Sequence, residues 1–260
     1  MSLVITKLLG LCTVQDFGRI GRMHEGLPRG GALVRSLLAR ANRAAHNPDD
    51  AAAIEVLGRL TVRATQEVEV ASDAETRLLR AGEELTIESE PRRVAYLALR
   101  GGVDAPVILG SRSTHASAGL GAPLRAGMHV AASDVGRRDA RLAALDLDAR
   151  EPIRVIAGPD TDAFEPRALA DLAAAPYRVL PTSDRVGTRL DGPRLARTAA
   201  PERSRPMTRG AIEVPRDGLP IVLGPEHPTT GGYPVIAVIA SDDLDRFFAI
   251  RLGGSVRFVV

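Results

Sequence analysis

Short runs in which apolar and polar residues alternate recur along the whole chain, and most are bounded by glycine or proline. Alternation with a period of two is typical of half-buried strands, whose successive side chains point to opposite faces of a sheet. The pattern therefore predicts many short strands. They are expected at residues 4–11, 60–64, 68–70, 85–87, 94–99, 153–157, 177–180, 211–214, 221–223, 235–240 and 256–260.

Helical periodicity is confined to a few short stretches. An apolar stripe predicts a helix over residues 33–45, and an alanine-rich run predicts another over 168–175, ended by Pro176. A third is expected to begin at residues 241–243, with Leu244, Phe247 and Phe248 facing inward. Because the helices do not alternate with the strands, we expect a mainly β protein with a few helices (α+β), built on a closed or partly closed barrel.

The length and composition are those of a folded protein. The chain has 260 residues, 45% of them hydrophobic and 25% charged. We expect a single unit over residues 1–260, with an alternative division into two lobes near 1–92 and 93–260. Two arginine-rich stretches, 131–150 and 198–209, are expected to be exposed connections, the second being either a mobile flap or, as we favour, a plain loop.

Charge and hydropathy exclude several classes of protein. The chain has 34 Lys and Arg against 32 Asp and Glu, a net charge of +2, and Lys7 is its only lysine. Since no arginine cluster is interleaved with aromatic residues, we expect no nucleic-acid partner. No apolar run approaches the roughly 20 residues that cross a bilayer, and residues 1–10 lack the pattern of a signal peptide. We therefore expect a cytoplasmic protein with no membrane partner.

Familiar catalytic motifs are absent from the sequence. Cys12 is the single cysteine, so no disulfide can form within the chain. The five histidines have no spacing typical of metal ligands, and we expect no metal site. The sequence contains no GxSxG nucleophile elbow, no P-loop and no GxGxxG that follows a strand. Any chemistry must come from other residues.

Four compact clusters combine glycine, hydroxyl side chains and arginine. Glycine lets a backbone approach a ligand closely, hydroxyls add donors, and a guanidinium holds a carboxylate or phosphate with two parallel hydrogen bonds. Clusters that converge in space would suit a small anionic substrate or an oxyanion, whereas each alone is also typical of an ordinary turn or a structural ion pair. The clusters are residues 13–19, 110–114, 183–187 and 229–234.

Taken in order, these clusters resemble one family over essentially the whole chain. It is the KipA-like family, which includes the C subunit of 5-oxoprolinase and allophanate hydrolase subunit 2, and which is described too as biotin-dependent carboxyltransferase-like. Further stretches that carry the resemblance are Gly26-Leu27-Pro28, Gly30-Gly31-Ala32, Ala41-Asn42, Tyr96-Leu97-Ala98, Gly101-Gly102, Arg189-Leu190, Gly210-Ala211-Ile212, Gly218-Leu219-Pro220-Ile221 and Val256-Arg257-Phe258.

The resemblance implies a cyclophilin-like β-barrel fold and a hetero-oligomer with a KipI-like B subunit and, as a further candidate, an A subunit. It implies the C subunit of a 5-oxoprolinase-type hydrolase that opens 5-oxoproline, or a related cyclic amide or urea-like substrate, to glutamate. ATP is used by that complex at a location that stays open. Alternatives are a non-catalytic regulatory module that docks a KipI-like protein, and a carboxyltransferase subunit of a urea carboxylase-like system.

Within the resemblance, particular residues are expected to form the site. Arg112 and Arg185 are assigned to anion contacts, and Asp16 or Glu213 to orienting a water or a cationic neighbour. The amides of Gly231 and Gly232 are assigned, with neighbouring threonines, to an oxyanion. The expected catalytic residues are Asp16, Arg112, Asp184 and Glu213, and the expected substrate-binding residues are Gln15, Arg19, Ser113, Thr114, Arg185, Thr229, Thr230, Gly231, Gly232 and Tyr233.

The sequence also departs from the family's usual pattern. Pro228 and Glu213 stand where the family usually has glutamine, Thr188 where an aromatic residue is common, and the segment 115–119 is shortened. Proline removes an amide side chain and a backbone donor, and glutamate adds an anion near an anionic substrate. These changes keep the regulatory alternative open.

Overall fold

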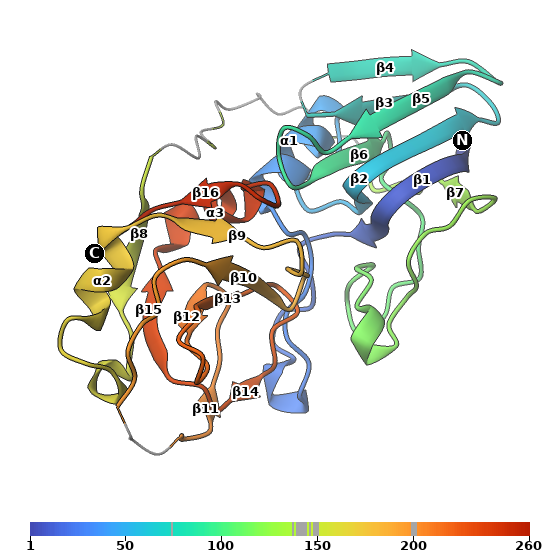
Figure 1. Cartoon of the computed structure of the whole chain (residues 1–260). Helices are drawn as coiled ribbons and strands as arrows, with labels where there is room; N and C mark the ends of the chain where they lie inside the picture. Colours follow the sequence, from blue (N-terminus) through green and yellow to red (C-terminus); the bar gives the residue numbers. More distant parts are fainter. Residues whose placement is uncertain (74, 137, 139–144, 146, 148–150, 199–201) are drawn as a thin grey trace. The chain divides into compact units, whose positions relative to one another are not determined.

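The computed structural model describes residues 1–73, 75–136, 138, 145, 147, 151–198 and 202–260 (Figure 1). It divides into two compact units, one made of Met1–Ile20 with Gly30–Leu145 and the other of Gly21–Arg29 with Asp146–Val260. We call them the amino-terminal and the carboxy-terminal unit. Among the described residues, no helix combines the length and the hydropathy needed to cross a bilayer.

A seven-stranded antiparallel sheet forms the amino-terminal unit. Its order is β4-β3-β6-β2-β1-β7, and β5 pairs with β2 off this path. Residues 54–56 of β2 pair with β6, whereas residues 59–63 pair with β5, so these two short strands share one long neighbour. The strands are β1 (Ser2–Gln15), β2 (Ala53–Ala64), β3 (Val68–Ser72), β4 (Glu75–Leu79), β5 (Glu84–Glu88), β6 (Ala95–Leu99) and β7 (His129–Ala131).

The expected boundary between lobes near residue 92 falls inside this sheet. It lies between β5 and β6, which both pair with β2, so strand pairing joins the two sides of that position. The chain instead passes between the units after residues 20, 29 and 145. The pattern of alternating residues marks the strands but not which of them share a partner.

The long pair β1–β2 needs a glycine on each strand at one position. Gly10 faces Gly58 across the two strands, with φ of +91° and +124°. A Cβ at Gly10 would lie 2.1 Å from the Leu57 carbonyl oxygen, and one at Gly58 would lie 2.2 Å from the Leu9 carbonyl oxygen. Only glycine allows this close approach and this backbone conformation.

Helix α1 (Arg35–Ala44) confirms the predicted apolar stripe, because Leu33, Leu37, Leu38, Ala41 and Ala45 are all buried. The backbone at its start is bound by side chains of the sheet. The Leu33 N–H donates to the Glu55 carboxylate at 2.7 Å, and the Val34 N–H donates to the Tyr96 hydroxyl at 3.0 Å. Side chains of β2 and β6 thus fix the two residues that lead into the helix.

An eight-stranded sheet forms the carboxy-terminal unit, in the order β16-β9-β10-β13-β12-β15-β8-β17. All its pairs are antiparallel except β8–β17. A separate ladder joins β11 (Arg205–Pro206) to β14 (Thr230–Gly231). The other strands are β8 (Ile153–Ala157), β9 (Tyr177–Val179), β10 (Gly187–Asp191), β12 (Ala211–Glu213), β13 (Ile221–Leu223), β15 (Val235–Ile239), β16 (Ser255–Val256) and β17 (Phe258–Val259).

Two helices complete this unit, and both are confirmed. They are α2 (Ala168–Ala174) and α3 (Leu244–Ala249), and in α3 Phe247 and Phe248 are buried while Leu244 is half-buried. The two phenylalanine rings meet edge to face with centroids 5.1 Å apart. Single-turn 3-10 helices are η1 (Met23–Glu25), η2 (Ala116–Ala118), η3 (Thr161–Ala163) and η4 (Ser241–Asp243). The expectation of a mainly β protein with few helices is therefore confirmed.

One predicted exposed connection is wrong in its second half. Residues 198–209 were expected to be a loop, but β11 pairs with β14, and Met207 is 3% exposed in a small apolar core with Ala211, Leu223 and Val235. Arginine and proline dominate the stretch, so one buried methionine and a two-residue strand leave no periodic signal. Residues 199–201, and most of the other predicted connection at 131–150, lie outside the described residues.

Candidate functional site

The first two clusters meet at the carboxylate of Asp16. Its Oδ1 accepts hydrogen bonds from the Gly18 N–H at 2.7 Å and from the hydroxyls of Ser111 at 2.6 Å and Ser113 at 2.5 Å. Its Oδ2 accepts the Arg112 N–H at 2.7 Å. We call this arrangement the Asp16 junction. Because both oxygens are bound by the chain's own donors, Asp16 is placed as a positioning residue that holds two loops together.

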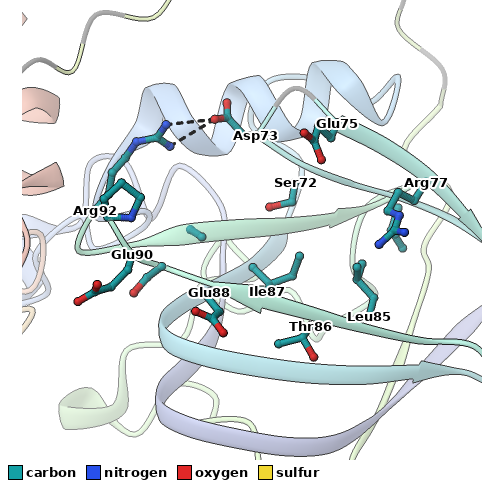
Figure 2. Close-up of a pocket in the computed structure, with 14 residues that line it drawn as sticks. Ser72, Asp73, Glu75, Arg77, Leu85, Thr86, Ile87, Glu88, Glu90 and Arg92 are labelled. Carbon is teal, nitrogen blue, oxygen red and sulfur yellow. Dashed lines mark hydrogen bonds and ion pairs between the residues drawn. The ribbon is translucent and has the colours of Figure 1, made fainter.

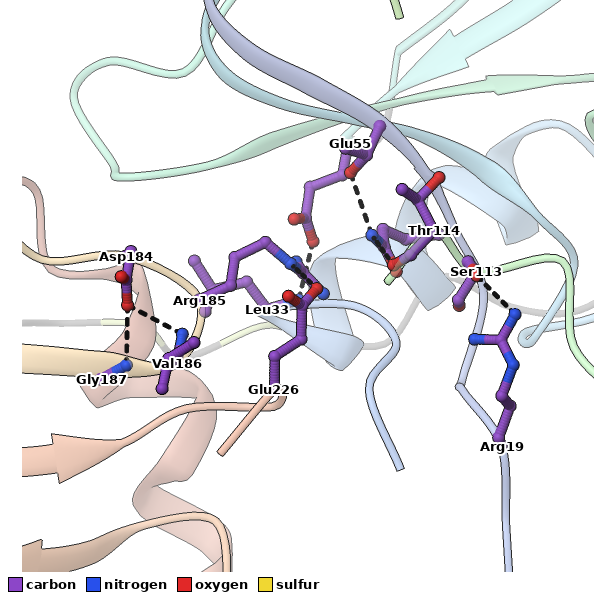
Figure 3. A network of polar contacts seen from close by, with 12 residues as sticks. Arg19, Leu33, Glu55, Ser113, Thr114, Asp184, Arg185, Val186, Gly187 and Glu226 are labelled. Carbon is purple, nitrogen blue, oxygen red and sulfur yellow. Dashed lines mark hydrogen bonds and ion pairs between the residues drawn. The ribbon is translucent and has the colours of Figure 1, made fainter. Parts of the chain in front are cut away.

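Buried polar side chains extend the junction on both sides. The Arg19 guanidinium, in a residue that is 1% exposed, donates to the Ile108 carbonyl at 3.0 Å. It also donates to the Ser113 carbonyl at 2.7 Å (Figure 3). The buried Gln15 donates from Nε2 to the Thr114 carbonyl at 3.1 Å. Segments nearly a hundred residues apart are thus joined by side-chain to backbone bonds.

A third segment backs the junction. The Ala32 N–H donates to the Asp16 carbonyl at 2.9 Å, and the preceding Gly31 has φ of +82°. A Cβ at Gly31 would lie 2.7 Å from the Gly18 nitrogen, which is closer than real Cβ atoms come to backbone. Glycine is therefore required here for both space and conformation.

A cavity of about 190 Å³ opens beside the junction. Arg19 and Arg112 both line it, together with the hydroxyl residues Ser113 and Thr114. Two guanidinium groups against the single carboxylate of Asp104 favour an anion. The volume is below the 300–1,000 Å³ or so that is typical of sites for drug-sized ligands, so the cavity suits a small acid or one carboxylate-bearing end of a substrate.

Contacts of the Arg112 side chain lie at the rim of this cavity. Its guanidinium donates to the Ala105 carbonyl and forms an ion pair with Asp104 at 3.2 Å, in which Asp104 is 58% exposed. An ion pair this exposed contributes little to stability and can open at small cost. Arg112 is thus the more accessible of the two guanidinium groups.

In the carboxy-terminal unit, the third cluster is a tight turn between β9 and β10. Oδ1 of Asp184 accepts the N–H groups of Val186 and Gly187, both at 2.9 Å (Figure 3). Nε of Arg185 is 2.6 Å from the Glu226 carboxylate, with both side chains under 10% exposed. The Glu226 carboxylate offsets the charge of Arg185, which weakens the case for Arg185 as the main anion contact.

The fourth cluster is a turn and a two-stranded ladder. The Met207 N–H donates to the Thr229 carbonyl at 3.0 Å, next to the β11–β14 pair. A Cβ at Gly231 would lie 2.5 Å from the Met207 Cε, whereas one at Gly232 would meet nothing within 4 Å. A side chain at Gly231 would therefore have to displace the end of the Met207 side chain. Gly232 and the 42% exposed Tyr233 face open space.

Glu213 lies in a cross-strand row with Ile221 and Arg189. Ile221 of β13 pairs with Glu213 of β12 on one side and with Arg189 of β10 on the other. Burial raises the pKa of Glu213 above its ordinary 4.5, and the charge of Arg189 works in the opposite direction. The sheet therefore favours the protonated carboxyl.

Replacing Glu213 by glutamine is expected to stabilise the protein at pH 8 and to change little at pH 4. Because the pKa is raised in the folded state, the folded protein holds this proton more tightly than the unfolded chain, and stability falls as pH rises from about 4.5 through the raised pKa. Glutamine has no such loss. Urea midpoints of both proteins at the two pH values provide the measurement, and an equal difference at both would contradict the prediction.

The predicted site residues divide between the two units. The structure joins those of the amino-terminal unit in one network, while those of the carboxy-terminal unit lie in a turn, a sheet row and a ladder. The first set is Gln15, Asp16, Arg19, Arg112, Ser113 and Thr114. The second set is Asp184, Arg185, Glu213, Thr229, Thr230, Gly231, Gly232 and Tyr233.

The sequence analysis did not identify two acidic residues of these networks. Glu55 is fully buried and binds both the Leu33 N–H and the Tyr96 hydroxyl. Its signal is an ionisable residue inside the apolar run 52–57. Glu226 lies three residues before the fourth cluster, and the sequence gives no sign of its pairing with Arg185.

These observations define a mainly β, two-unit protein with a small anion-suited cavity. Residues 71–260 match the model of the family described as the carboxyltransferase domain, subdomain A and B. The chain belongs to this family, and the family resemblance stated above is confirmed.

Several proteins of known name align with almost the whole chain. The 5-oxoprolinase C subunit of Escherichia coli K12 is 33% identical over 95% of this chain and 87% of its own length. The Haemophilus influenzae protein of the same name is 29% identical with the same coverage. The urea amidolyase of Lachancea kluyveri is 27% identical over 95% of this chain, which spans only 16% of that enzyme.

Solved structures agree on the fold. TTHA0988 superposes with a TM-score of 0.87 at 27% identity over all of this chain, which spans 55% of that chain. The Kluyveromyces lactis urea carboxylase has a TM-score of 0.87 at 23% identity, with 99% of this chain covering 27% of that one. The second likeness is one of fold alone.

Proposed function

We propose that the chain is the C subunit of a 5-oxoprolinase-type hydrolase, which opens 5-oxoproline to glutamate with a KipI-like B subunit and an A subunit. The observation that carries this proposal is the 33% identity, over 95% of the chain, to a protein named as the C subunit of 5-oxoprolinase. The same name recurs at 29% identity in a second organism.

The chemistry of the substrate matches the cavity beside the Asp16 junction. 5-Oxoproline is a small acid whose carboxylate can be held by the guanidinium of Arg112 at the cavity rim. Opening the ring breaks the lactam C–N bond: a water oxygen bonds to the carbonyl carbon, and a proton goes to the departing nitrogen. Thr114 lines the same cavity and carries a hydroxyl group suited to the polar ring atoms, whereas the Ser113 hydroxyl is already bound to Asp16.

ATP would supply the energy that drives opening of a stable lactam. The Leu33 and Val34 N–H groups that precede α1 are taken by Glu55 and Tyr96, so they are not available to a phosphate. Because the sequence also contains no P-loop, we assign ATP to another chain of the assembly.

Two alternatives have a specific observation in their favour. The identity to urea amidolyases across 95% of the chain favours a carboxyltransferase role, for which biotin would come on another chain. Pro228 and Glu213 favour a regulatory module that docks a KipI-like protein without chemistry of its own.

Reconstitution with the partner proteins separates these functions. Purified A and B subunits are mixed with or without this chain, and glutamate and ADP are measured with 5-oxoproline and ATP present. The proposal predicts 5-oxoproline-dependent glutamate only when all three chains are present. Binding to the KipI-like protein without turnover would favour the regulatory module, and carboxyl transfer from a biotinylated carrier to urea would favour the carboxyltransferase.

A further inference from the structure

A second and larger hollow lies on the amino-terminal unit, away from the predicted clusters. It has a volume of about 550 Å³, and its walls come from β3, β4, β5 and residues 89–92 (Figure 2). Val70, Leu85 and Ile87 form an apolar floor, and each is at least nine-tenths buried. We call this hollow the β5 groove. Its volume lies within the range that binding sites commonly have.

The edge of β5 borders this groove. Among the described residues β5 pairs only with β2. The residues just beyond its two ends bond to β2, with the Ser89 N–H donating to the Gly58 carbonyl and the Ala64 N–H donating to the Glu83 carbonyl. Backbone bonds alternate along an antiparallel pair, so the main chain of Leu85 and Ile87 also points to β2.

The same alternation turns the main chain of Glu84, Thr86 and Glu88 away from β2. These residues therefore present a row of N–H and C=O groups that another strand could pair with. All four residues from Leu85 to Glu88 line the groove, whatever the face on which their side chains lie. That is the expected result when the edge of a strand, rather than one face, borders a hollow.

Exposed charge at the groove is net negative. Four carboxylates and two guanidinium groups line it. The guanidinium of Arg92 is bound to Asp73 (Figure 2). Arg40 also pairs with Asp73, so that carboxylate is fully offset. Glu88 pairs with Arg59 at 2.8 Å. Glu75 and Glu90 remain, both exposed, against Arg77. The groove thus complements a basic occupant.

We propose that the β5 edge binds an extended segment of a partner protein in which basic and apolar residues alternate. The segment adds to the sheet as a strand beside β5, which gives it main-chain hydrogen bonds. Its apolar side chains lie on Leu85 and Ile87, and its basic side chains lie near Glu75 and Glu90. The proposal is independent of the hydrolase activity, because none of these residues lies at the Asp16 junction.

The test uses the full chain and a short fluorescent peptide of alternating lysine and valine. Fluorescence anisotropy is expected to show saturable binding. Thr86→Pro removes one edge N–H that β2 does not use, and it is expected to weaken binding about tenfold. Thr86→Val keeps that N–H and removes only the hydroxyl, which bonds to Thr61. Its affinity is expected to stay close to that of the unmodified protein.

A change of charge at the groove provides a second, independent test. Glu75→Lys changes an exposed side chain and is expected to weaken binding of the basic peptide, while an alternating glutamate and valine peptide is expected not to bind. Circular dichroism establishes whether each variant is folded. If Thr86→Pro does not fold, the comparison of Glu75→Lys with the unmodified protein still tests the proposal. Equal binding of both peptides, equal affinity of Thr86→Pro and Thr86→Val in folded protein, or no binding of the basic peptide would overturn the proposal.

Discussion

Replacing Asp16 by alanine is expected to lower the free energy of unfolding of the amino-terminal unit by about 3 kcal/mol or more. The change removes one carboxylate that accepts four hydrogen bonds, and it leaves the N–H groups of Gly18 and Arg112 without that acceptor. Hydrogen exchange on the full chain provides the measurement, because it reports each unit separately. The loss is expected to be largest in residues 16–19 and 110–114.

Two variants control this experiment. Asp16→Asn keeps one oxygen acceptor but places an N–H₂ group near the Arg112 N–H, so it is expected to fall between the wild type and the alanine variant. Asp104→Ala removes an exposed partner of the Arg112 side chain and is expected to cost at most about 1 kcal/mol. An Asp16→Ala protein with unchanged exchange in both segments would show that the junction does not hold the loops.

Replacing Glu226 by alanine is expected to destabilise the carboxy-terminal unit by about 3–5 kcal/mol. Glu226 and Arg185 are both almost fully buried, and the variant would leave a buried guanidinium without its carboxylate, 2.6 Å away in the native protein. Restoring neutrality with Arg185→Met in the same chain is expected to recover a good part of the loss, because no charge then remains unpaired.

The matched control is an exposed ion pair in the same unit. Arg178 and Asp191 are 3.1 Å apart, with side chains 63% and 48% exposed. Asp191→Ala is expected to cost at most about 1 kcal/mol. Hydrogen exchange of β10 and β13 gives the comparison for all variants. If the two alanine variants lost the same amount of stability, burial would not be what makes the Arg185–Glu226 pair important.

Strand positions could be predicted because alternation is a local property. Residues 153–157 and 221–223 are strands with the predicted bounds, and the stripe at 33–45 is a buried helix face. The pair β11–β14 could not be predicted, since two-residue strands are too short to alternate. The division near residue 145 also escaped prediction, because it depends on which strands pair rather than on composition.

The site was predictable in its members but not in its connections. Glycine, hydroxyl and arginine clusters identify Asp16 and Arg112, yet the bond between them joins residues 96 positions apart. A sequence contains no direct record of such a contact. The same limit hid Glu226, because its importance comes from a buried partner 41 positions away rather than from its neighbours.

Glutamate formation by the reconstituted assembly, with wild-type chain and with Arg112→Ala, tests the central claim most directly. Arg112 reaches Asp16 through its backbone N–H, so the alanine variant keeps the junction and removes only the guanidinium from the cavity. The account predicts no glutamate without this chain, and a kcat/KM for 5-oxoproline at least about tenfold lower for the variant. Full turnover by the A and B subunits without this chain, or an unchanged kcat/KM for Arg112→Ala, would contradict it.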